Sequence, residues 1–298
     1  MCILIGKYFK GVGWVVAKNR DQDYTPTVYF PDEPGKFDDN VLVQYDEQTG
    51  YSEGMNKYGM GIITTSSTES LMAETDDKDG LTIHKALKCK TPQEAADYLV
   101  NHKLDGYVAV FNKDTMIFIE SDKNDRGEYH HVMKEIPLTE TIVRTNHGVW
   151  LKTSGYQPGI DPVQTRNWKS SVCRLKLAEK IAKEANDPMD LIDGLASKNN
   201  DNLQMNNFRV QTKPREMRTV SQIMVVPSKK TIYVRPVDCR IILDPAKENI
   251  KVNVLSNKIL LKTYPSLKAK PIKTIDKKDG SVIITTECKK IKNFISFI

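Results

Sequence analysis

The second residue of the chain would combine two reactive groups if it became the first. The sequence begins Met1-Cys2, and cytosolic removal of an initiator methionine is permitted before a small residue such as cysteine. The α-amine of Cys2 would then have a pKa of about 7.7–8.0, below the ~10.4 of a lysine, and an amine near neutral pH is a competent general base. Because the thiolate is the reactive form of sulfur, the sequence predicts a nucleophile and its base within one residue.

A short hairpin predicts which residues meet Cys2. The apolar runs 2–8 and 14–18 flank a turn with two glycines at 9–13, which is typical of two antiparallel strands. Opposed residue numbers in such a pair sum to about 21–23, so Cys2 should lie beside the charged segment 18–23. A cation from that segment would lower the pKa of the thiol, and a carboxylate would hold the α-ammonium. The alternative is a buried structural cysteine beside a solvated strand end.

The rest of the chain predicts an α+β protein. Helices are expected at 92–102, which opens with a Thr-Pro-Gln-Glu capping box, at 167–186, where apolar residues share one helical face, and at about 188–195. Strand–turn–strand units are expected at 107–120 and 219–234. This order differs from the βαβ alternation of dinucleotide-binding sheets, and no glycine-rich phosphate-binding motif follows a strand.

Length and composition favour one globular domain. A chain of 298 residues with 39% hydrophobic and 28% charged residues is in the ordinary range, and we expect its core over about 2–240. No apolar run exceeds five residues, which argues against a membrane-spanning helix and favours a cytoplasmic location. Five widely spaced cysteines indicate neither a disulfide framework nor a zinc site, and no cofactor is expected.

Positive charge is concentrated toward the C-terminus. The net charge is +6, while residues 246–298 carry twelve lysines and four acidic residues. Such a segment can attract nucleic acid, but lysines without arginine or aromatic clusters are more typical of a solvated face. We therefore expect 241–298 to supply basic C-terminal strands or an extension. Nucleic-acid binding through this segment is a rival hypothesis.

The N-terminal region resembles a known group of enzymes. Met1–Ile5 followed by Ala17–Tyr24 looks like the N-terminal-nucleophile (Ntn) hydrolases of the choloylglycine hydrolase and penicillin V acylase kind. It is also similar to the acyl-coenzyme A:isopenicillin N acyltransferase group and to a family named for its Asn-Arg-Asp-Glu motif. The resemblance implies that Asp21 contacts the nucleophile. Lys18 stands where the family has arginine, and Arg20 is the alternative source of a guanidinium group, which lysine cannot replace.

Two further segments carry the resemblance. Gly54–Met60 is similar to the family's Gly-Met-Asn-Glu-x-Gly-Leu turn, and the strand after it ends at Thr65-Ser66-Ser67, where acylases have an oxyanion-hole asparagine. Val143–His147 resembles a Thr-Asn-His segment whose asparagine completes the oxyanion hole, which implies that role for Asn146. Such a donor contributes roughly 2.7–4 kcal/mol of transition-state stabilisation. A turn cap with a partly exposed histidine is the alternative for this segment.

Arginines and substrate contacts complete the predicted site. Ser170–Arg174, in the predicted long helix, resembles a Ser-x-x-Arg feature of these families. An active-site arginine is expected shortly before the 219–234 hairpin, where we favour Arg209 and the sequence leaves Arg215 and Arg218 as alternatives. The residues expected to contact the substrate are Asn19, Ser66 and His147.

The resemblance implies both a fold and an activity. The fold would be the α+β, four-layer αββα Ntn-hydrolase sandwich of two antiparallel sheets. The activity would be that of an amidohydrolase or acyltransferase that cuts a linear amide of a small molecule through an acyl-enzyme on Cys2, away from membranes. A homo-oligomer is compatible with this activity. The rival from the same resemblance is a non-enzymatic relative that handles haem or lipid, as is associated with the Asn-Arg-Asp-Glu family.

The remaining histidines and the tryptophans give weaker indications of function. His130-His131 lacks a third ligand at suitable spacing, so no metal site is predicted there. His84 and His102 are expected on exposed helix surfaces. The three tryptophans are expected in the core, with an acyl pocket as the alternative: Trp14, Trp150 and Trp168.

Overall fold

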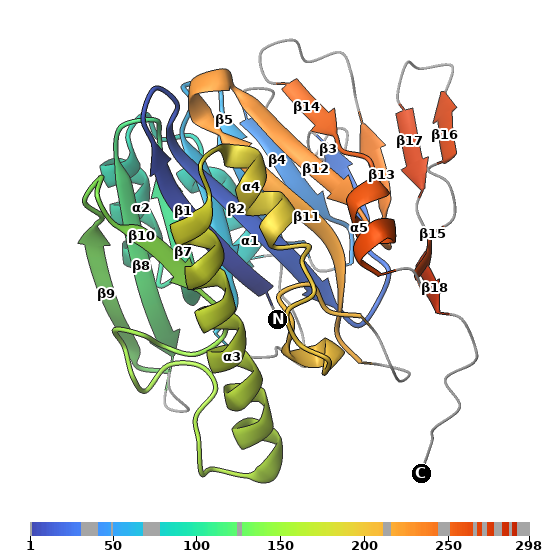
Figure 1. Ribbon diagram of the computed structural model, residues 1–298. Coiled ribbons are helices and arrows are strands. Elements are labelled where there is room, and N and C mark those ends of the chain that lie inside the picture. The colour runs from blue at the N-terminus through green and yellow to red at the C-terminus, as the bar shows by residue number, and fades with distance from the viewer. Residues whose placement is uncertain are drawn as a thin grey trace.

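The structure is a computed structural model of the chain. In the part that it describes, the chain forms two large sheets, one two-stranded sheet and five α-helices (Figure 1). The described residues are 2–30, 41–48, 50–67, 78–123, 127–210, 216–243, 251–264, 267–269, 273–276, 282–285 and 288–290.

A six-stranded sheet contains the predicted N-terminal hairpin. Its strand order is β10-β1-β2-β11-β12-β14. The strands are β1 (Cys2–Phe9), β2 (Gly13–Gln22), β10 (Thr141–Arg144), β11 (Arg218–Val226), β12 (Thr231–Pro236) and β14 (Lys251–Val254). Within the hairpin Cys2 lies opposite Arg20 and Phe9 lies opposite Gly13. The predicted pairing of Cys2 with the 18–23 segment is confirmed.

A ten-stranded sheet lies behind the first one in the view of Figure 1. Its strand order is β16-β17-β13-β3-β4-β5-β6-β7-β8-β9. The strands are β3 (Thr27–Phe30), β4 (Val41–Asp46), β5 (Ser52–Asn56), β6 (Gly61–Thr65), β7 (Gly106–Phe111), β8 (Met116–Lys123), β9 (Tyr129–Glu135), β13 (Arg240–Leu243), β16 (Lys273–Asp276) and β17 (Val282–Thr285). The small sheet pairs β15 (Leu267–Ala269) with β18 (Cys288–Lys290).

Two strand pairs are parallel, so the prediction of two purely antiparallel sheets is wrong. β12 pairs with β14, and β3 pairs with β13, in parallel. Parallel neighbours need a crossover connection, and here the chain leaves β12 in one sheet, forms β13 in the other and returns to form β14. The segment 241–298 therefore adds strands to both sheets, while much of its lysine-rich part lies outside the described residues.

Side-chain caps mark the start of three of the described α-helices. The helices are α1 (Lys78–Ala86), α2 (Pro92–Asn101), α3 (Pro162–Glu184), α4 (Pro188–Gly194) and α5 (Lys258–Thr263). Thr91 Oγ1 accepts a hydrogen bond from the Glu94 backbone N–H at 3.2 Å, as the capping box predicts. α3 begins before the predicted residue 167 because the carboxylate of Asp161 accepts the backbone N–H groups of Val163 and Gln164. Among the described residues, no helix has the length and apolarity needed to cross a membrane.

The short helix α1 corrects one prediction. His84 is only 2% exposed, so its predicted position on an exposed surface is wrong. Ile83 on the same helix and Leu87 just after it are fully buried against the ten-stranded sheet, and His84, next to Ile83, is buried as well. The sequence indicated a helix at His84 but not which of its faces the sheet covers.

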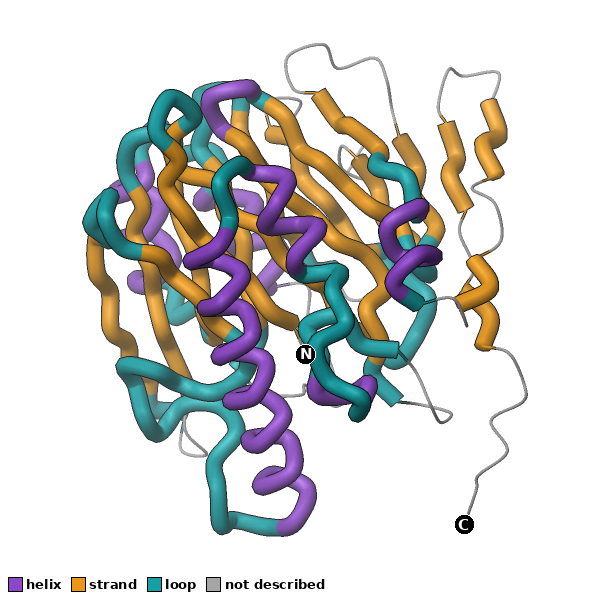
Figure 2. The backbone as a smooth tube through the Cα atoms, viewed as in Figure 1, coloured by secondary structure: helices purple, strands orange, loops and turns teal. Residues whose placement is uncertain are grey.

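Helices cover the outer side of each large sheet (Figure 2). α3 and α4 pack on the six-stranded sheet, where Ile3 and Ala17 share a buried cluster with Ala178 and Leu191. α1 and α2 pack on the ten-stranded sheet in a second buried cluster. That cluster includes Ile62, Leu87, Leu99 and Val110.

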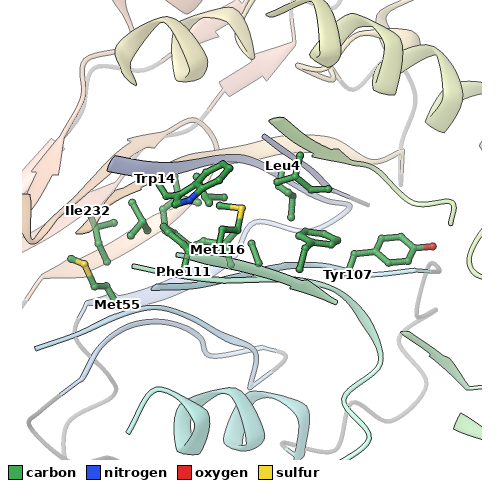
Figure 3. Packing of buried hydrophobic residues seen from close by; sticks show 14 of the residues in the cluster. Leu4, Trp14, Met55, Tyr107, Phe111, Met116 and Ile232 are labelled. Atoms are coloured by element: carbon green, nitrogen blue, oxygen red, sulfur yellow. The ribbon is translucent and has the colours of Figure 1, made fainter. Parts of the chain in front are cut away.

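The two large sheets pack against each other through a third cluster (Figure 3). Leu4 and Trp14 of the six-stranded sheet meet Met55, Phe111 and Met116 of the ten-stranded sheet, and all five side chains are buried. Each such side chain stabilises the fold by roughly 1.5–3 kcal/mol relative to an exposed position. This cluster fixes the position of the N-terminal hairpin on the second sheet.

Alternation along β2 decides which side each polar residue faces. Successive side chains of a strand point to opposite faces, and Trp14 lies in the inter-sheet cluster while Ala17 lies in the helix-side cluster. Lys18 and Arg20 therefore face the ten-stranded sheet. Asn19 and Asp21 face α3 and α4.

Candidate active site

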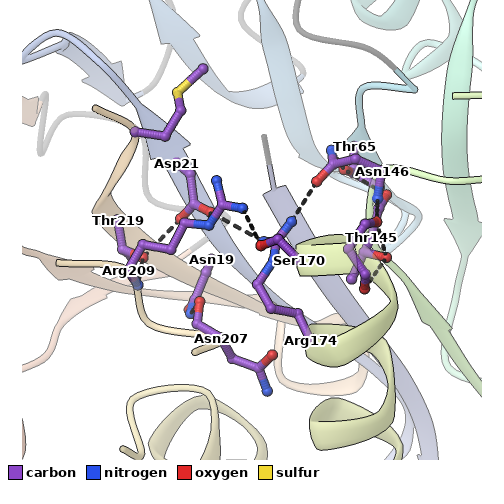
Figure 4. Close-up of polar contacts among 12 residues, drawn as sticks. Asn19, Asp21, Thr65, Thr145, Asn146, Ser170, Arg174, Asn207, Arg209 and Thr219 are labelled. Carbon is purple, nitrogen blue, oxygen red and sulfur yellow. Dashed lines mark hydrogen bonds and ion pairs between the residues drawn. The ribbon is translucent and has the colours of Figure 1, made fainter. Parts of the chain in front are cut away.

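Asp21, near the end of β2, is the centre of a buried polar group (Figure 4). Its carboxylate is fully buried and accepts a hydrogen bond from Thr219 Oγ1 at 2.8 Å. Two guanidinium groups also reach it: Arg174 Nη1 lies 3.3 Å from Asp21 Oδ2, and Arg209 Nε lies 3.7 Å from the same oxygen. Residues from β2, β11, α3 and the loop before β11 therefore meet at one carboxylate.

Arg174 links Asp21 to the predicted oxyanion asparagine. While Nη1 contacts Asp21, Nη2 donates to Asn146 Oδ1 at 2.7 Å. Burial and the neighbouring charge of Arg209 lower the pKa of Arg174 to about 9, against opposing contributions from Asp21 and Cys2. The guanidinium still carries its charge at neutral pH, so Arg174 can hold an amide oxygen and a carboxylate at once.

The side-chain amide of Asn146 is oriented by its partners. A guanidinium group can only donate, so the oxygen of Asn146 faces Arg174 and its NH₂ group points the other way. There Asn146 Nδ2 donates to the Ser66 backbone oxygen at 2.8 Å and lies 3.5 Å from Thr65 Oγ1. One amide hydrogen is held firmly, and the second makes only a long contact that a better acceptor could replace.

Cys2 occupies the start of β1 at the edge of this group. The residue is 7% exposed and lies opposite Arg20 in the hairpin. Negative charge on Cys2 contributes to raising the pKa of Arg20 and of Tyr51, and it opposes the lowering of the pKa of Arg174. The sulfur is therefore within electrostatic reach of cations on both sides of β2.

Lys18 and Arg20 are engaged in buried ion pairs with the ten-stranded sheet. Lys18 Nζ lies 2.6 Å from Glu53 Oε2, and Arg20 Nη2 pairs with Asp46, whose carboxylate also accepts from Tyr24 Oη at 2.7 Å. Burial lowers the pKa of Arg20. The negative charges of Asp46 and other nearby acidic groups outweigh this effect, so the pKa of Arg20 lies above its usual value. Each cation thus has a carboxylate partner of its own. The predicted effect of these cations on the thiol stays a prediction.

Asn19 holds the helix side of the sheet together. Its Nδ2 donates to the backbone oxygens of Leu195 and Asn207 at 3.0 and 2.8 Å, and its Oδ1 accepts from Gln222 Nε2 at 2.7 Å. Both amide hydrogens are therefore bonded to backbone carbonyls. Substrate contact by Asn19 stays a prediction, and these bonds give the residue a role in positioning the two segments that it joins.

Of the three candidate arginines, Arg209 lies at Asp21. Arg209 Nη2 also donates to Ser170 Oγ at 2.9 Å, and its backbone N–H donates to Thr219 Oγ1 at 2.9 Å. Arg218 instead pairs with Asp238 at 2.6 Å. Arg215 lies outside the described residues.

His147 lies between Asn146 and a surface hollow. Its Nδ1 is 2.7 Å from Ser171 Oγ, which also accepts the Asn146 backbone N–H at 2.9 Å. Burial, followed by the charges of Lys152 and Arg174, lowers the pKa of His147 to about 4, so the imidazole is neutral at pH 7. The hollow has a volume of about 350 Å³. Its lining includes Trp168, while Trp14 is buried in the inter-sheet cluster and Trp150 packs against it.

Some contacts and residues of this group were not predicted from the sequence. Arg174 had a signal, the Ser-x-x-Arg spacing in the predicted helix, but its contacts with Asn146 and Asp21 could not be anticipated from it. Asp46 and Glu53 had none, since an isolated acidic residue in a strand gives no indication of its partner. Within the described residues, no three His, Cys, Asp or Glu side chains converge as a metal site would require.

Comparisons with known proteins find distant likeness among solved structures. The chain matches no protein-family model, and no curated protein is similar to it. Among solved structures it is similar to a mutant of the conjugated bile acid hydrolase from Clostridium perfringens, with 11% identical residues and a TM-score of 0.41. The similarity covers 79% of this chain and 89% of that one. A likeness at this level does not extend to individual side chains.

Proposed function

We propose that the protein is a cysteine-type Ntn hydrolase that cleaves, or transfers the acyl group of, a linear amide. The observation that carries the proposal is the bridge made by Arg174, which contacts both Asn146 and Asp21. Asp21 and Asn146 were expected at one site on independent segments, and the bridge lies within electrostatic reach of Cys2. A structural role for any one of these residues would not require the three segments to converge.

In the proposed reaction, Cys2 acts as nucleophile and base after Met1 has been removed. The thiol proton passes to the α-amine, and the sulfur forms a bond to the carbonyl carbon of the amide. Collapse of the tetrahedral intermediate breaks the C–N bond, and the leaving amine takes the proton from the α-ammonium. Water then attacks the thioester and releases the acid, or a second amine attacks and takes the acyl group.

Two groups would serve the charges that develop in this reaction. Asp21 would hold the α-ammonium of Cys2, since its carboxylate lies at the end of the strand paired with β1. The second amide hydrogen of Asn146 would bind the oxyanion, because its present contact with Thr65 Oγ1 is 3.5 Å long. Arg174 fixes the amide in the orientation that this role needs. Such a donor contributes roughly 2.7–4 kcal/mol at the transition state.

Arg20 and Lys18 would have different roles in the site. Arg20 lies opposite Cys2 in the hairpin and is coupled to its charge, so we assign to Arg20 the support of the thiolate. Lys18 lies opposite Leu4 and would mainly hold Glu53. Ser66 would contribute through its backbone oxygen, which anchors Asn146.

The proposal also covers the layers of the fold, the class of substrate and the cellular location. We assign the chain to the four-layer αββα arrangement within a single domain, supported by the helices that cover each large sheet. The substrate would be a small-molecule amide in the cytoplasm, handled without a cofactor. Whether the protein works as a homo-oligomer is a separate expectation, which sedimentation of the purified protein would check.

Intact-protein mass spectrometry tests the proposal directly. The purified protein should lack the mass of one methionine and should gain one acyl group from an electrophilic ester probe. Cys2→Ala should abolish both labelling and turnover, whereas Cys89→Ala, which removes a half-buried cysteine on the far side of the ten-stranded sheet, should leave both unchanged. Retention of Met1, or equal labelling of Cys2→Ala, would reject the proposal.

A further inference from the structure

The hollow beside His147 is built from two kinds of side chain. Trp168 and Val172, one turn apart on α3, supply an apolar wall, and Tyr156 supplies a second aromatic ring. Lys152 and His147 supply polar groups. A volume of about 350 Å³ suits a small organic molecule, since ligand pockets span roughly 300–1,000 Å³.

The two ring nitrogens of His147 differ in their contacts with the described residues. Nδ1 contacts Ser171 Oγ at 2.7 Å and Thr145 Oγ1 at 3.2 Å. Nε2 makes no hydrogen bond to any residue that the structure describes. In the structure Ser171 Oγ donates to Thr145 Oγ1 at 2.8 Å. When the Ser171 hydroxyl turns to donate to Nδ1 instead, the hydrogen of the neutral ring is on Nε2, and the ring is a donor there.

The charges around the hollow favour an anion. None of the described residues that line it is acidic, and the exposed Lys152 adds a positive charge to the lining. The carboxylate whose charge raises the pKa of His147 is that of Glu120. That carboxylate is already bonded to Arg144 and to the backbone N–H groups of residues 149–151. Positive charge from Lys152 and Arg174 is therefore the stronger influence on the ring.

We propose that this hollow is a binding site for an aryl carboxylate. The flat apolar part would lie against Trp168 and Val172, and the carboxylate would accept from His147 Nε2 and pair with Lys152. Binding selects the tautomer in which Ser171 donates to Nδ1. Because Ser171 Oγ also accepts from the Asn146 backbone N–H, the ligand would be connected to Asn146 through two side chains. The inference concerns binding and does not depend on chemistry at Cys2.

The test compares 2-naphthoate with its neutral analogue 2-naphthamide by titration calorimetry. The carboxylate should bind roughly tenfold more tightly, as expected for a charge-assisted contact in a partly enclosed site. In ¹H–¹⁵N NMR spectra, the indole N–H signal that Trp168→Phe removes should be the one that shifts most. Both results should be the same in Cys2→Ala, so that failure of the proposed reaction leaves this inference standing and the reverse also holds.

A pair of lysine variants completes the test. Lys152→Gln should weaken 2-naphthoate about five- to tenfold and leave 2-naphthamide within about twofold, while Lys152→Arg should retain binding. Lys169→Gln is the matched control, since Lys169 is exposed on α3 beside Trp168 but does not line the hollow. Equal affinity for the two ligands, equal effects of Lys152→Gln and Lys169→Gln, or an unmoved Trp168 signal would each overturn the inference.

Discussion

The two faces of β2 solve the problem of buried charge in different ways. On the face toward the ten-stranded sheet, Lys18 and Arg20 each have a separate carboxylate, Glu53 and Asp46. On the face toward α3, two arginines contact the single carboxylate of Asp21. The first arrangement matches each cation with its own carboxylate, and the second concentrates positive charge where the proposed reaction would create negative charge.

The pKa of Arg174 shows the consequence of this difference. After burial, the main cause that lowers it to about 9 is the charge of Arg209, and the acids Asp21 and Cys2 oppose that effect. An additional negative charge, such as that of an oxyanion, would relieve the repulsion between the two guanidinium groups. The comparison therefore predicts that changes on the two faces affect different properties of the protein.

The largest effect is expected from Lys18→Met, on the face of β2 toward the ten-stranded sheet. The substitution leaves the carboxylate of Glu53 buried without its cation, which typically costs about 3–5 kcal/mol of unfolding free energy. The rate at which an acyl probe labels Cys2 should change by no more than about threefold at a denaturant concentration where the variant is folded. Urea denaturation and labelling kinetics measure the two quantities.

The double variant Lys18→Met/Glu53→Met is the control for this prediction. Replacement of both partners by apolar side chains should recover most of the lost stability, because a buried ion pair is often no more stable than well-packed apolar residues. A labelling rate that collapses in both variants would show that the Lys18–Glu53 pair takes part in the chemistry, and its assignment as a structural ion pair would fail.

A smaller effect, on the other property, is expected from Asn146→Ala on the face toward α3. Loss of the proposed oxyanion donor should reduce kcat/KM for an amide substrate by roughly 10²–10³-fold. Asn206→Ala is the matched control, because Asn206 is also a buried amide but is bonded to the loop at residues 199–202. If both variants lose activity equally, Asn146 acts through the stability of the fold and not through the oxyanion.

The smallest expected effect is on the pH dependence of stability, through His147. The pKa of His147 is about 4 in the folded protein and about 6.5 in an unfolded chain. The unfolded state therefore binds more protons between these values, so this contribution to stability is complete above about pH 6.5 and is lost as the pH falls toward 4. His147→Gln should lose less stability than the wild type over that interval. Urea midpoints that fall in parallel would contradict the assignment.

The local parts of the site were predictable from sequence, and the long-range parts were not. The hairpin register followed approximately from turn length, because antiparallel pairing limits which residues are opposed. It placed Cys2 beside the segment 18–23, within which the structure pairs it with Arg20. The alternation of Lys18 to Asp21 between two faces was also available in the sequence as a period of two. The partners Asp46 and Glu53 were not, because their choice depends on how one sheet packs on the other.

The same limit explains the errors in the fold. A sequence pattern indicates strands but not the order in which a crossing chain inserts them, so the parallel pairs at β13 and β14 were missed. Of the two candidate arginines that the structure describes, Arg209 contacts Asp21 and Arg218 pairs with Asp238, a difference that depends on long-range packing. His84 was misplaced because the sequence does not indicate which face of its helix packs on the ten-stranded sheet.

Helix α3 has one further consequence for how this protein can vary. Trp168, Ser171 and Arg174 follow one another at intervals of three residues, and they serve the hollow, the backbone of Asn146 and the Asp21 carboxylate in turn. Each residue advances a helix by about 100°, so inserting a single amino acid between the first and the last of them would rotate one away while the other stayed in place. Point substitutions can change each contact separately, but insertions or deletions between Trp168 and Arg174 would disrupt several contacts at once.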